Sequence, residues 1–301
     1  MKILIINKKN QYWSIALLSV ISISILSCEK DITVDLPVPE SKIVVDGYVE
    51  PNRPIYVLLT RNAPYFAPIN QNTLINSVEK GAIVTVSDGD TTVRLTEIDT
   101  LVNGFTISGF YIALSGMIGQ PGKQYNLKVV SSKGEVVTAS TNLMVPVPLD
   151  SVWFKLIENN DTLGFVWAHL TDPDTTGNCY RWFAKRVDKD QSFIAPFGSS
   201  FEDRFINGKS FDFAYNRGSI QNSTAIDDNN EEAGFFKKGD TIIVKFCSID
   251  RGVYEFWRDA EAQIGNNGGP FASPSNIKSN VVGGLGCFAG YSAVYDTLIA
   301  R

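Results

Sequence analysis

The chain has 301 residues, 44% of them hydrophobic, and a formal net charge of −5. This length suggests one or two domains with full hydrophobic cores. The modest acidity argues against a nucleic-acid partner and against adhesion to anionic lipid head groups, both of which require a basic face. Many Thr, Val, Ile, Phe and Tyr residues favour β structure.

Residues 1–27 have the pattern of a secretory signal peptide. Three lysines precede an apolar run over residues 15–26, and Ser27–Cys28 follows it. The run is shorter than the roughly 18 residues that a membrane span requires. Ile25–Leu26–Ser27–Cys28 resembles the bacterial lipobox, in which the cysteine is lipidated and becomes the first residue of the mature protein.

Two alternatives to lipidation are an ordinary signal peptide with a chance cysteine and a single membrane anchor. We favour lipidation of Cys28 because a lone cysteine directly after the apolar run has few other uses. Each buried methylene of a lipid contributes about 0.8 kcal/mol, so several acyl chains would hold a water-soluble body firmly. Residues 28–40 are then a lipidated tether, and the mature chain carries 24 basic and 32 acidic side chains, a net charge of about −8.

Residues 41–142 predict an immunoglobulin-like β-sandwich. Short runs of alternating apolar and polar residues are separated by turn signals such as Ser87–Asp88–Gly89–Asp90. Tyr125 enters a late strand after Pro121–Gly122, so we expect a tyrosine corner, in which the hydroxyl bonds back to the backbone; one more buried aromatic is the alternative. The predicted strands are 42–49, 55–61, 82–88, 92–98, 105–114, 125–129 and 135–141.

Residues 143–149 contain two prolines two positions apart and predict an extended linker. Residues 150–301 predict a second β-rich domain that contains one helix, 251–264, capped by Asp250. Residues 190–232 show weak periodicity and predict loops with short strands. The strands predicted in this domain are 152–157, 162–169, 178–187, 241–249 and 291–299.

Three cysteines follow Cys28, and their spacing contains neither a CxxC motif nor a metal-binding pattern. One disulfide would leave one thiol over, and Cys247–Cys287 is the pair that we favour. Three buried free thiols, including Cys179, are the alternative.

No catalytic motif is present in the sequence, so we expect a protein that is not an enzyme and has no cofactor. The single histidine, His169, follows Phe165 and Trp167 on one strand face, so we expect a structural role for it. A catalytic pair of His169 and Cys179 would form only if folding happened to bring the two side chains together. Acidic clusters at 172–174 and 227–232 lack the spacing of a calcium loop, so no metal site is predicted.

Aromatic residues gather in long polar loops, including residues 62–76 and 190–232. Loop aromatics often form binding surfaces because they offer large contact area at low entropy cost. The alternative is that these rings pack on their own domain. The candidate contacts for a ligand or partner are Tyr65, Phe66, Phe193, Phe197 and Phe201.

A recurring Asp-Thr/Ser pair followed by Thr or an apolar residue resembles the O-glycosylation acceptor of exported Bacteroidota proteins. The alternative is local turn chemistry, since Asp in a turn followed by a β-branched residue begins a strand well. The candidate acceptors are Thr91, Thr100, Ser151, Thr162, Thr175, Thr241 and Thr297.

Several segments together resemble a known family: Cys28–Lys30, Val34–Pro37, Lys42–Val49, Leu59–Tyr65, Gly81–Gly89, Pro146–Ser151 and Asn276–Gly290 with its Gly283–Gly286 run. They are similar to the domain-of-unknown-function 4249 lipoproteins of Bacteroidota over residues 28–301. The resemblance implies an outer-membrane lipoprotein, often encoded beside TonB-dependent transporters, with no established catalytic residues. Glu29–Asp31 resembles a weak signal for export to the cell surface.

We therefore expect a lipid-anchored protein of the outer membrane that faces the cell exterior. Its expected role is an accessory or binding subunit of a β-barrel transporter. One alternative is a glycan or peptide hydrolase with an unrecognised carboxylate site, which would require two carboxylates about 5–10 Å apart in a cleft. The other is a structural or assembly lipoprotein without a small ligand.

Overall fold

The computed structural model describes residues 40–63, 73, 77–102, 105–114, 116–218, 234–265 and 276–301. The signal peptide, Cys28 and most of the tether lie outside the described residues, as do Tyr65 and Phe66. Glu40–Arg301 forms one compact unit. Among the described residues, no helix is both long and apolar enough to cross a membrane.

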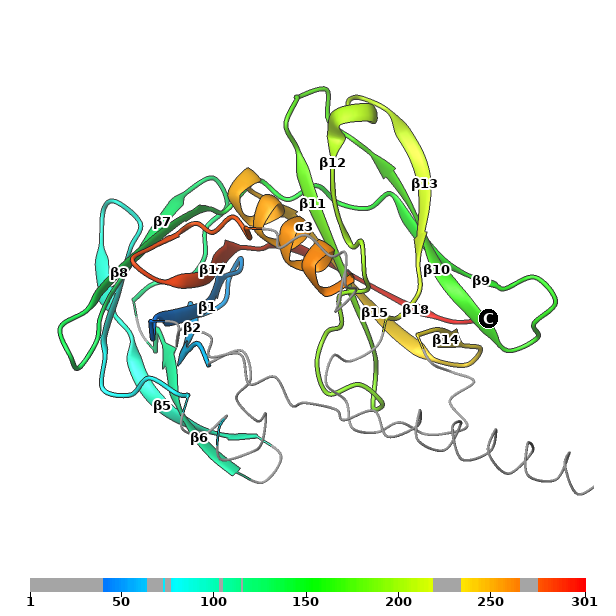
Figure 1. Cartoon of the computed structure of the whole chain (residues 1–301). Coiled ribbons are helices and arrows are strands. Elements are labelled where there is room, and N and C mark those ends of the chain that lie inside the picture. Colours follow the sequence, from blue (N-terminus) through cyan, green and yellow to red (C-terminus); the bar gives the residue numbers. More distant parts are fainter. Residues whose placement is uncertain are drawn as a thin grey trace, which may run out of the picture. The chain divides into compact units, whose positions relative to one another are not determined.

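Strands from the first half of the chain, each set joined by one strand from near its end, build two five-stranded sheets (Figure 1). The first sheet has the order β17-β1-β2-β6-β5 and the second β16-β8-β7-β3-β4. The strands of the first sheet are β1 Ile43–Val49, β2 Tyr56–Arg61, β5 Thr96–Val102, β6 Phe105–Ile112 and β17 Leu285–Gly290. The strands of the second are β3 Ile83–Ser87, β4 Thr92–Arg94, β7 Gln124–Val130, β8 Val136–Asn142 and β16 Val281–Val282.

Period-two alternation places one face of each strand in a shared core. Along β7 the side chains of Tyr125, Leu127 and Val129 are buried while their neighbours are exposed. They belong to one hydrophobic cluster with β1 and β2 residues such as Val45 and Leu59. The mainly β, sandwich-like fold is thus confirmed, because burial of one face per strand is what the alternation requires.

The tyrosine corner at Tyr125 is confirmed. The Tyr125 hydroxyl accepts a hydrogen bond from the Gln120 backbone N–H at 2.7 Å and donates to the Ile118 carbonyl at 3.3 Å. The ring itself is fully buried. The hydroxyl therefore satisfies backbone groups at the turn that leads into β7.

One predicted strand, 92–98, is wrong as a single element. It divides into β4 and β5, which lie in different sheets. Leu95 stands at the division, 3% exposed, and its N–H donates to the Val84 carbonyl at 2.9 Å. The chain changes sheets there because the Leu95 side chain turns into the core.

Two strands near the end of the chain complete the sheets of residues 43–142. β17 pairs with β1 in parallel, and β16 pairs with β8. Gly286 has φ +97°, and a Cβ atom on it would lie 2.0 Å from the Val45 carbonyl oxygen. Glycine at this position of β17 therefore allows the strand's backbone to lie directly against β1.

The remaining strands form two four-stranded sheets with an aromatic-rich core. In the first of these sheets, β10 is bordered by β9, β13 and β14; the second has the order β12-β11-β15-β18. The first contains β9 Ser151–Leu156, β10 Leu163–Thr171, β13 Ser210–Tyr215 and β14 Phe236–Lys237. The second contains β11 Cys179–Arg186, β12 Ser200–Glu202, β15 Thr241–Ile249 and β18 Ser292–Ile299, with a 3-10 turn, η1, at Asp203–Phe205.

Helix α3, Arg251–Gly265, lies against β11, β12 and β17 (Figure 1). The predicted cap is confirmed, since Asp250 Oδ1 accepts from the Val253 N–H at 2.9 Å. The other oxygen, Oδ2, accepts from the Thr141 hydroxyl at 2.6 Å and the Asn142 N–H at 2.8 Å. One carboxylate therefore fixes the start of α3 to the end of β8.

The favoured Cys247–Cys287 disulfide is wrong. Cys179, Cys247 and Cys287 are all free and buried in a cluster under α3. Burial raises the pKa of Cys179 to about 11 and that of Cys247 to about 12. The thiols therefore stay protonated and pack as small apolar groups.

Candidate functional site

A pocket of about 510 Å³ is lined mainly by aromatic and charged side chains. They come from β1, β2, β11, β15, β18, α3 and the loop after β11. This combination of apolar walls and a few charged groups is typical of a ligand site. The lining residues are Asp46, Tyr48, Glu50, Arg53, Tyr56, Phe183, Lys185, Gln191, Ser192, Phe193, Lys245, Trp257, Tyr291 and Tyr295.

Strand register brings these side chains together. Phe183, Lys245 and Tyr295 stand opposite one another across β11, β15 and β18, so they share one face of that sheet. Tyr48 and Tyr56 are opposed on β1 and β2, with ring centroids 5.1 Å apart. Both sets of residues line the pocket, so two sheets contribute a wall each.

Lys245 is held in an aromatic cage. Its Nζ atom lies 5.1–5.8 Å from the ring centroids of Tyr48, Phe183, Phe193 and Tyr291. Each ring presents a face whose quadrupole attracts a cation. Lys245 is only 8% exposed, so these faces replace much of the hydration of its ammonium.

The Lys245 ammonium also forms an ion pair with Glu50, which is 4% exposed. The Tyr295 hydroxyl donates to Glu50 Oε2 at 3.0 Å, and Arg53 Nε lies 3.5 Å from the same oxygen. A buried ion pair persists only when further contacts offset the loss of water. Here Tyr295 and Arg53 provide two further contacts to the Glu50 carboxylate.

Asp46 is the pocket carboxylate with a different environment. Its side chain is exposed within the pocket and makes no hydrogen bond or ion pair with any described residue. The surrounding protein raises the pKa of this carboxyl by displacing water, an effect that the Arg181 charge partly opposes. Asp46 is therefore an acceptor without a partner that faces the pocket.

Arg181 lies behind the aromatic wall and is 4% exposed. Its guanidinium stacks on Trp257 at 3.5 Å from the ring centroid, and one nitrogen lies 3.7 Å from Glu261 Oε1. Burial lowers the pKa of Arg181 and raises that of Glu261. Nε and Nη1 of Arg181 have no hydrogen-bond partner, so the charge is held mainly by stacking and by Glu261.

Two carboxylates in one pocket raise the question of hydrolysis. Glycosidases need their carboxyl groups about 5–10 Å apart. Asp46 and Glu50 are four residues apart on one extended segment, about 13 Å at the usual rise per residue. Glu50 is moreover paired with Lys245. This pair therefore does not favour the hydrolase alternative.

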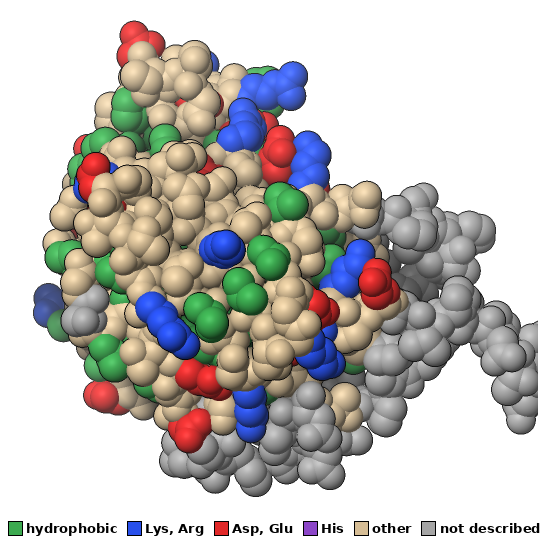
Figure 2. Space-filling model, turned by 90° about the vertical axis from the view of Figure 1, so that its left-hand side faces the viewer, with side chains coloured by type: hydrophobic (Ala, Val, Ile, Leu, Met, Phe, Trp, Pro, Cys, Tyr) green, Lys and Arg blue, Asp and Glu red, His purple; other side chains and the backbone are tan. Residues whose placement is uncertain are grey.

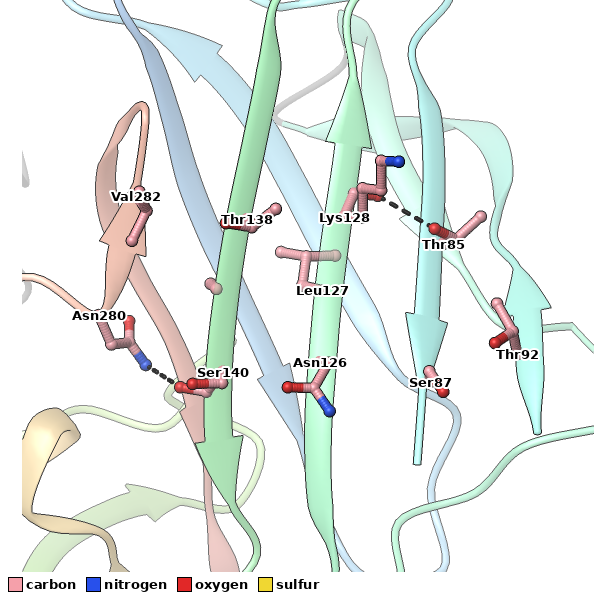
Figure 3. A pocket seen from close by; sticks show the side chains of 11 residues that line it. Thr85, Ser87, Thr92, Asn126, Leu127, Lys128, Thr138, Ser140, Asn280 and Val282 are labelled. Carbon is pink, nitrogen blue, oxygen red and sulfur yellow. Dashed lines mark hydrogen bonds between the residues drawn. The ribbon is translucent and has the colours of Figure 1, made fainter. Parts of the chain in front are cut away.

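A second pocket of about 490 Å³ lies on the outer face of the sheet that contains β7 and β8 (Figure 3). Its lining consists mostly of hydroxyl and amide side chains, and Lys128 is the one charged residue in it. Thr85 Oγ1 donates to the Lys128 carbonyl at 3.3 Å, and Asn280 Nδ2 donates to the Ser140 carbonyl at 2.9 Å.

The molecular side on which β7 and β8 lie in Figure 1 faces the viewer in Figure 2. Uncharged polar side chains and backbone dominate it, with isolated charged and hydrophobic side chains between them. Among the described residues that line the second pocket, no rings and charges converge as they do around Lys245. The aromatic pocket is therefore the better candidate site.

The described loop aromatics divide among three environments. Phe193 lines the aromatic pocket, 5.9 Å from the Tyr295 ring. Phe201 packs instead among Tyr180, Phe213 and Phe246 in the core. Phe197 is 66% exposed. Of these three rings, Phe193 is the one that the fold brings to the pocket.

The candidate O-glycosylation acceptors are all within the described residues. Thr100 and Thr241 are half-buried. The other five are exposed: Thr91, Ser151, Thr162, Thr175 and Thr297. Occupancy stays a prediction, and peptide mass spectrometry of native protein that finds only bare peptides at all seven positions would rule it out.

His169 is paired with a carboxylate on the neighbouring strand. Its Nδ1 lies 2.6 Å from Asp212 Oδ1, and the two residues are opposed across β10 and β13. Cys179 donates a weak hydrogen bond to the Gly177 carbonyl, 3.7 Å away. Within the described ranges, no group of three or more His, Cys, Asp or Glu side chains could hold a metal ion.

Sequence reasoning missed the charged centre of the pocket. Lys245 stands in the middle of the apolar strand TIIVKFCSI, and Glu50 follows the apolar end of β1. A lysine inside a buried strand requires a counter-charge. A lysine in such a strand therefore predicts a buried ion pair, but the sequence does not show which acidic residue is the partner.

Residues 29–296 match the protein family described as Domain of unknown function (DUF4249). The match includes every strand from β1 to β17 and most of β18, together with the aromatic pocket. No curated protein matches the sequence.

Proposed function

The chain belongs to the DUF4249 family, whose description names no activity, and we propose that it is a lipoprotein that binds a ligand or partner without catalysis. In this proposal the lipid on Cys28 anchors the protein to the outer membrane, with its body towards the cell exterior. The body is an accessory subunit of a TonB-dependent β-barrel transporter.

The observation that supports binding is the aromatic pocket. Seven aromatic side chains and five charged ones converge on about 510 Å³, enough for a ligand of a few residues or sugar rings. Aromatic rings contribute large contact area at low entropy cost, and charged groups select the orientation of a ligand. Such a pocket favours a ligand-binding protein over a purely structural lipoprotein.

The anchor is supported by the sequence around Cys28. A lipobox-like Ile25–Cys28 follows a short apolar run, and the body that follows has a net charge of about −8. An acidic body would not adhere to anionic lipid by itself, so the lipid would supply the attachment. Cys28→Ser should therefore move the protein from the membrane fraction to the soluble fraction, and retention in the membrane would contradict the anchor.

The transporter role is tested by extracting tagged native protein from outer membranes in mild detergent and identifying its companions by mass spectrometry. A stoichiometric β-barrel transporter is expected. Recovery of the lipoprotein alone, at normal abundance and with intact lipid, would overturn the proposed stable complex. Cys28→Ser protein is the control, because it should lose membrane companions while keeping its fold.

A further inference from the structure

The pocket already contains one bound cation, which belongs to the protein itself. Lys245 is held by a carboxylate, Glu50, and by four aromatic rings. Its site is complete, since the Tyr295 hydroxyl satisfies the second oxygen of Glu50. A carboxylate flanked by aromatic rings is a general solution for holding an ammonium or guanidinium group.

Asp46 is likewise a carboxylate beside aromatic rings, but no described residue forms an ion pair with it. Tyr48 is two residues away on the same face of β1, and Tyr56 stands opposite Tyr48 on β2. The Tyr291 ring, whose centroid lies 6.2 Å from that of Tyr48, lines the same pocket. Asp46 itself has no hydrogen bond or ion pair with the described residues.

We propose that Asp46, with the rings of Tyr48 and Tyr56, is the subsite that binds a cationic group of the ligand, an ammonium or a guanidinium carried by a peptide. The inference rests on the proposed binding function and names the ligand class of the same pocket. The carboxylate supplies a charge-assisted hydrogen bond, and the rings supply cation–π contacts.

The neighbouring positive charges do not prevent such binding. Lys245 and Arg53 both lie against the Glu50 carboxylate, which offsets much of their charge, and Lys185 is held over the Phe193 ring. Arg181 lies behind Trp257, with Glu261 as its counter-charge. Its charge partly opposes the rise in the pKa of Asp46 that burial causes.

A capped tripeptide, acetyl-Ala-Lys-Ala-amide, is a suitable probe. Its binding to the full mature chain can be followed through the NMR signal of the Trp257 indole N–H, which lines the pocket and donates to the Tyr291 hydroxyl at 2.8 Å. Acetylation of the lysine removes its charge and replaces the ammonium by a neutral amide. We expect at least tenfold weaker binding of the acetylated peptide.

Asp46→Asn should weaken binding of the lysine peptide by a similar factor, because it removes the charge and keeps the shape. Asp161→Asn is the matched control, since Asp161 is exposed in a turn outside the pocket. An unchanged melting temperature shows that each variant folds. Equal binding of the two peptides, equal binding by wild type and Asp46→Asn, or no shift of Trp257 at several millimolar lysine peptide would each overturn the inference.

A neutral trisaccharide, maltotriose, separates this inference from the wider proposal. If maltotriose shifts Trp257 and the lysine peptide does not, the pocket still binds a ligand but the cationic class is wrong. If neither probe shifts Trp257, the cationic subsite is also wrong, and co-purification with a transporter tests the remaining proposal on its own.

Discussion

Single charged residues carry much of the chemistry of this protein. The Lys245–Glu50 pair is buried, yet its contacts are complete, with rings on the ammonium side and a phenol on the carboxylate side. Removal of one partner leaves the other as an uncompensated charge in a region of low polarity. The free energy lost in this way is larger than the net stabilisation that the pair provides.

Lys245→Met should lower the free energy of unfolding by about 3–5 kcal/mol, because Glu50 remains buried without its cation. Lys245→Met with Glu50→Gln should recover much of this loss. Lys185→Met is the control: Lys185 is half-buried over Phe193 alone and should change stability by about 1 kcal/mol or less. Urea unfolding measures all three, and equal losses for Lys245→Met and Lys185→Met would contradict the cage.

Glu135 provides a pH-dependent contribution to stability. Hydrogen bonds from Arg61 and from Ser131 lower the pKa of its carboxyl from 4.5 to about 2. A group whose pKa is depressed in the folded state stabilises the fold above its unfolded pKa and loses that contribution as the pH falls through the folded pKa. The contribution should therefore be constant above about pH 5 and disappear between about pH 4.5 and 2.

The difference in urea midpoint between wild type and Glu135→Gln, measured at pH 7, 4 and 3, checks this expectation. The difference should shrink as the pH falls. Glu158→Gln is the control, since Glu158 is exposed in the turn after β9 and makes no interaction with any described residue. If the difference in urea midpoint between wild type and Glu135→Gln does not change with pH, Arg61 does not hold this carboxylate ionised.

At the scale of elements, the start of α3 joins two parts of the fold through Asp250. One oxygen caps the helix, and the other accepts from Thr141 and Asn142 at the end of β8. The helix in turn covers the cluster of three thiols and supplies Trp257 to the pocket. The position of the pocket wall therefore depends on one capping residue.

Asp250→Ala should lower the free energy of unfolding by about 2–4 kcal/mol, the sum of a lost cap and unsatisfied donors on β8. Asp250→Asn should lose less than Asp250→Ala, because its side-chain oxygen can still accept from the Val253 N–H, although its amide NH2 would leave the Asn142 N–H without an acceptor. Asp161→Ala, in an exposed turn, should change stability by less than about 0.5 kcal/mol. Thermal and urea unfolding measure the loss of stability in each variant. A loss for Asp250→Ala as small as that for Asp161→Ala would contradict the role of Asp250 in joining α3 to β8.

At the scale of the whole molecule, the parallel pairing of β1 with β17 connects residues more than 200 positions apart. The pairing needs glycine at position 286, where a Cβ atom would meet the Val45 carbonyl oxygen at 2.0 Å. Gly89 has a similar φ of +94° but no atom within 4 Å of such a Cβ. A comparison of alanine substitutions at the two positions therefore separates the cost of a positive φ from the cost of a backbone clash.

Gly89→Ala should cost about 1–2 kcal/mol through strain alone. Gly286→Ala should cost about 3 kcal/mol or more, since it adds a backbone clash to the same strain. Urea unfolding of both variants gives the comparison. Similar costs at the two positions would mean that β17 does not lie as close to β1 as the pairing requires.

Local patterns in the sequence determined most elements of this protein. Alternation predicted β1, β2, β3 and β7, and an apolar run predicted β15. The turn before Tyr125 predicted its corner, and Asp250 predicted the helix cap. These features depend on residues close in sequence, for which periodicity and turn chemistry are sufficient. Phe193, chosen as a loop aromatic, also lies at the pocket.

Tertiary structure alone decided which of these elements meet. The sequence contains no local signal that β17 pairs with β1, that Lys245 reaches Glu50, or that Phe201 packs in the core while Phe193 lines the pocket. The cysteine spacing likewise could not choose between a disulfide and three buried thiols. Each of these contacts joins segments far apart in the chain, so it depends on the packing of whole sheets rather than on the residues beside it.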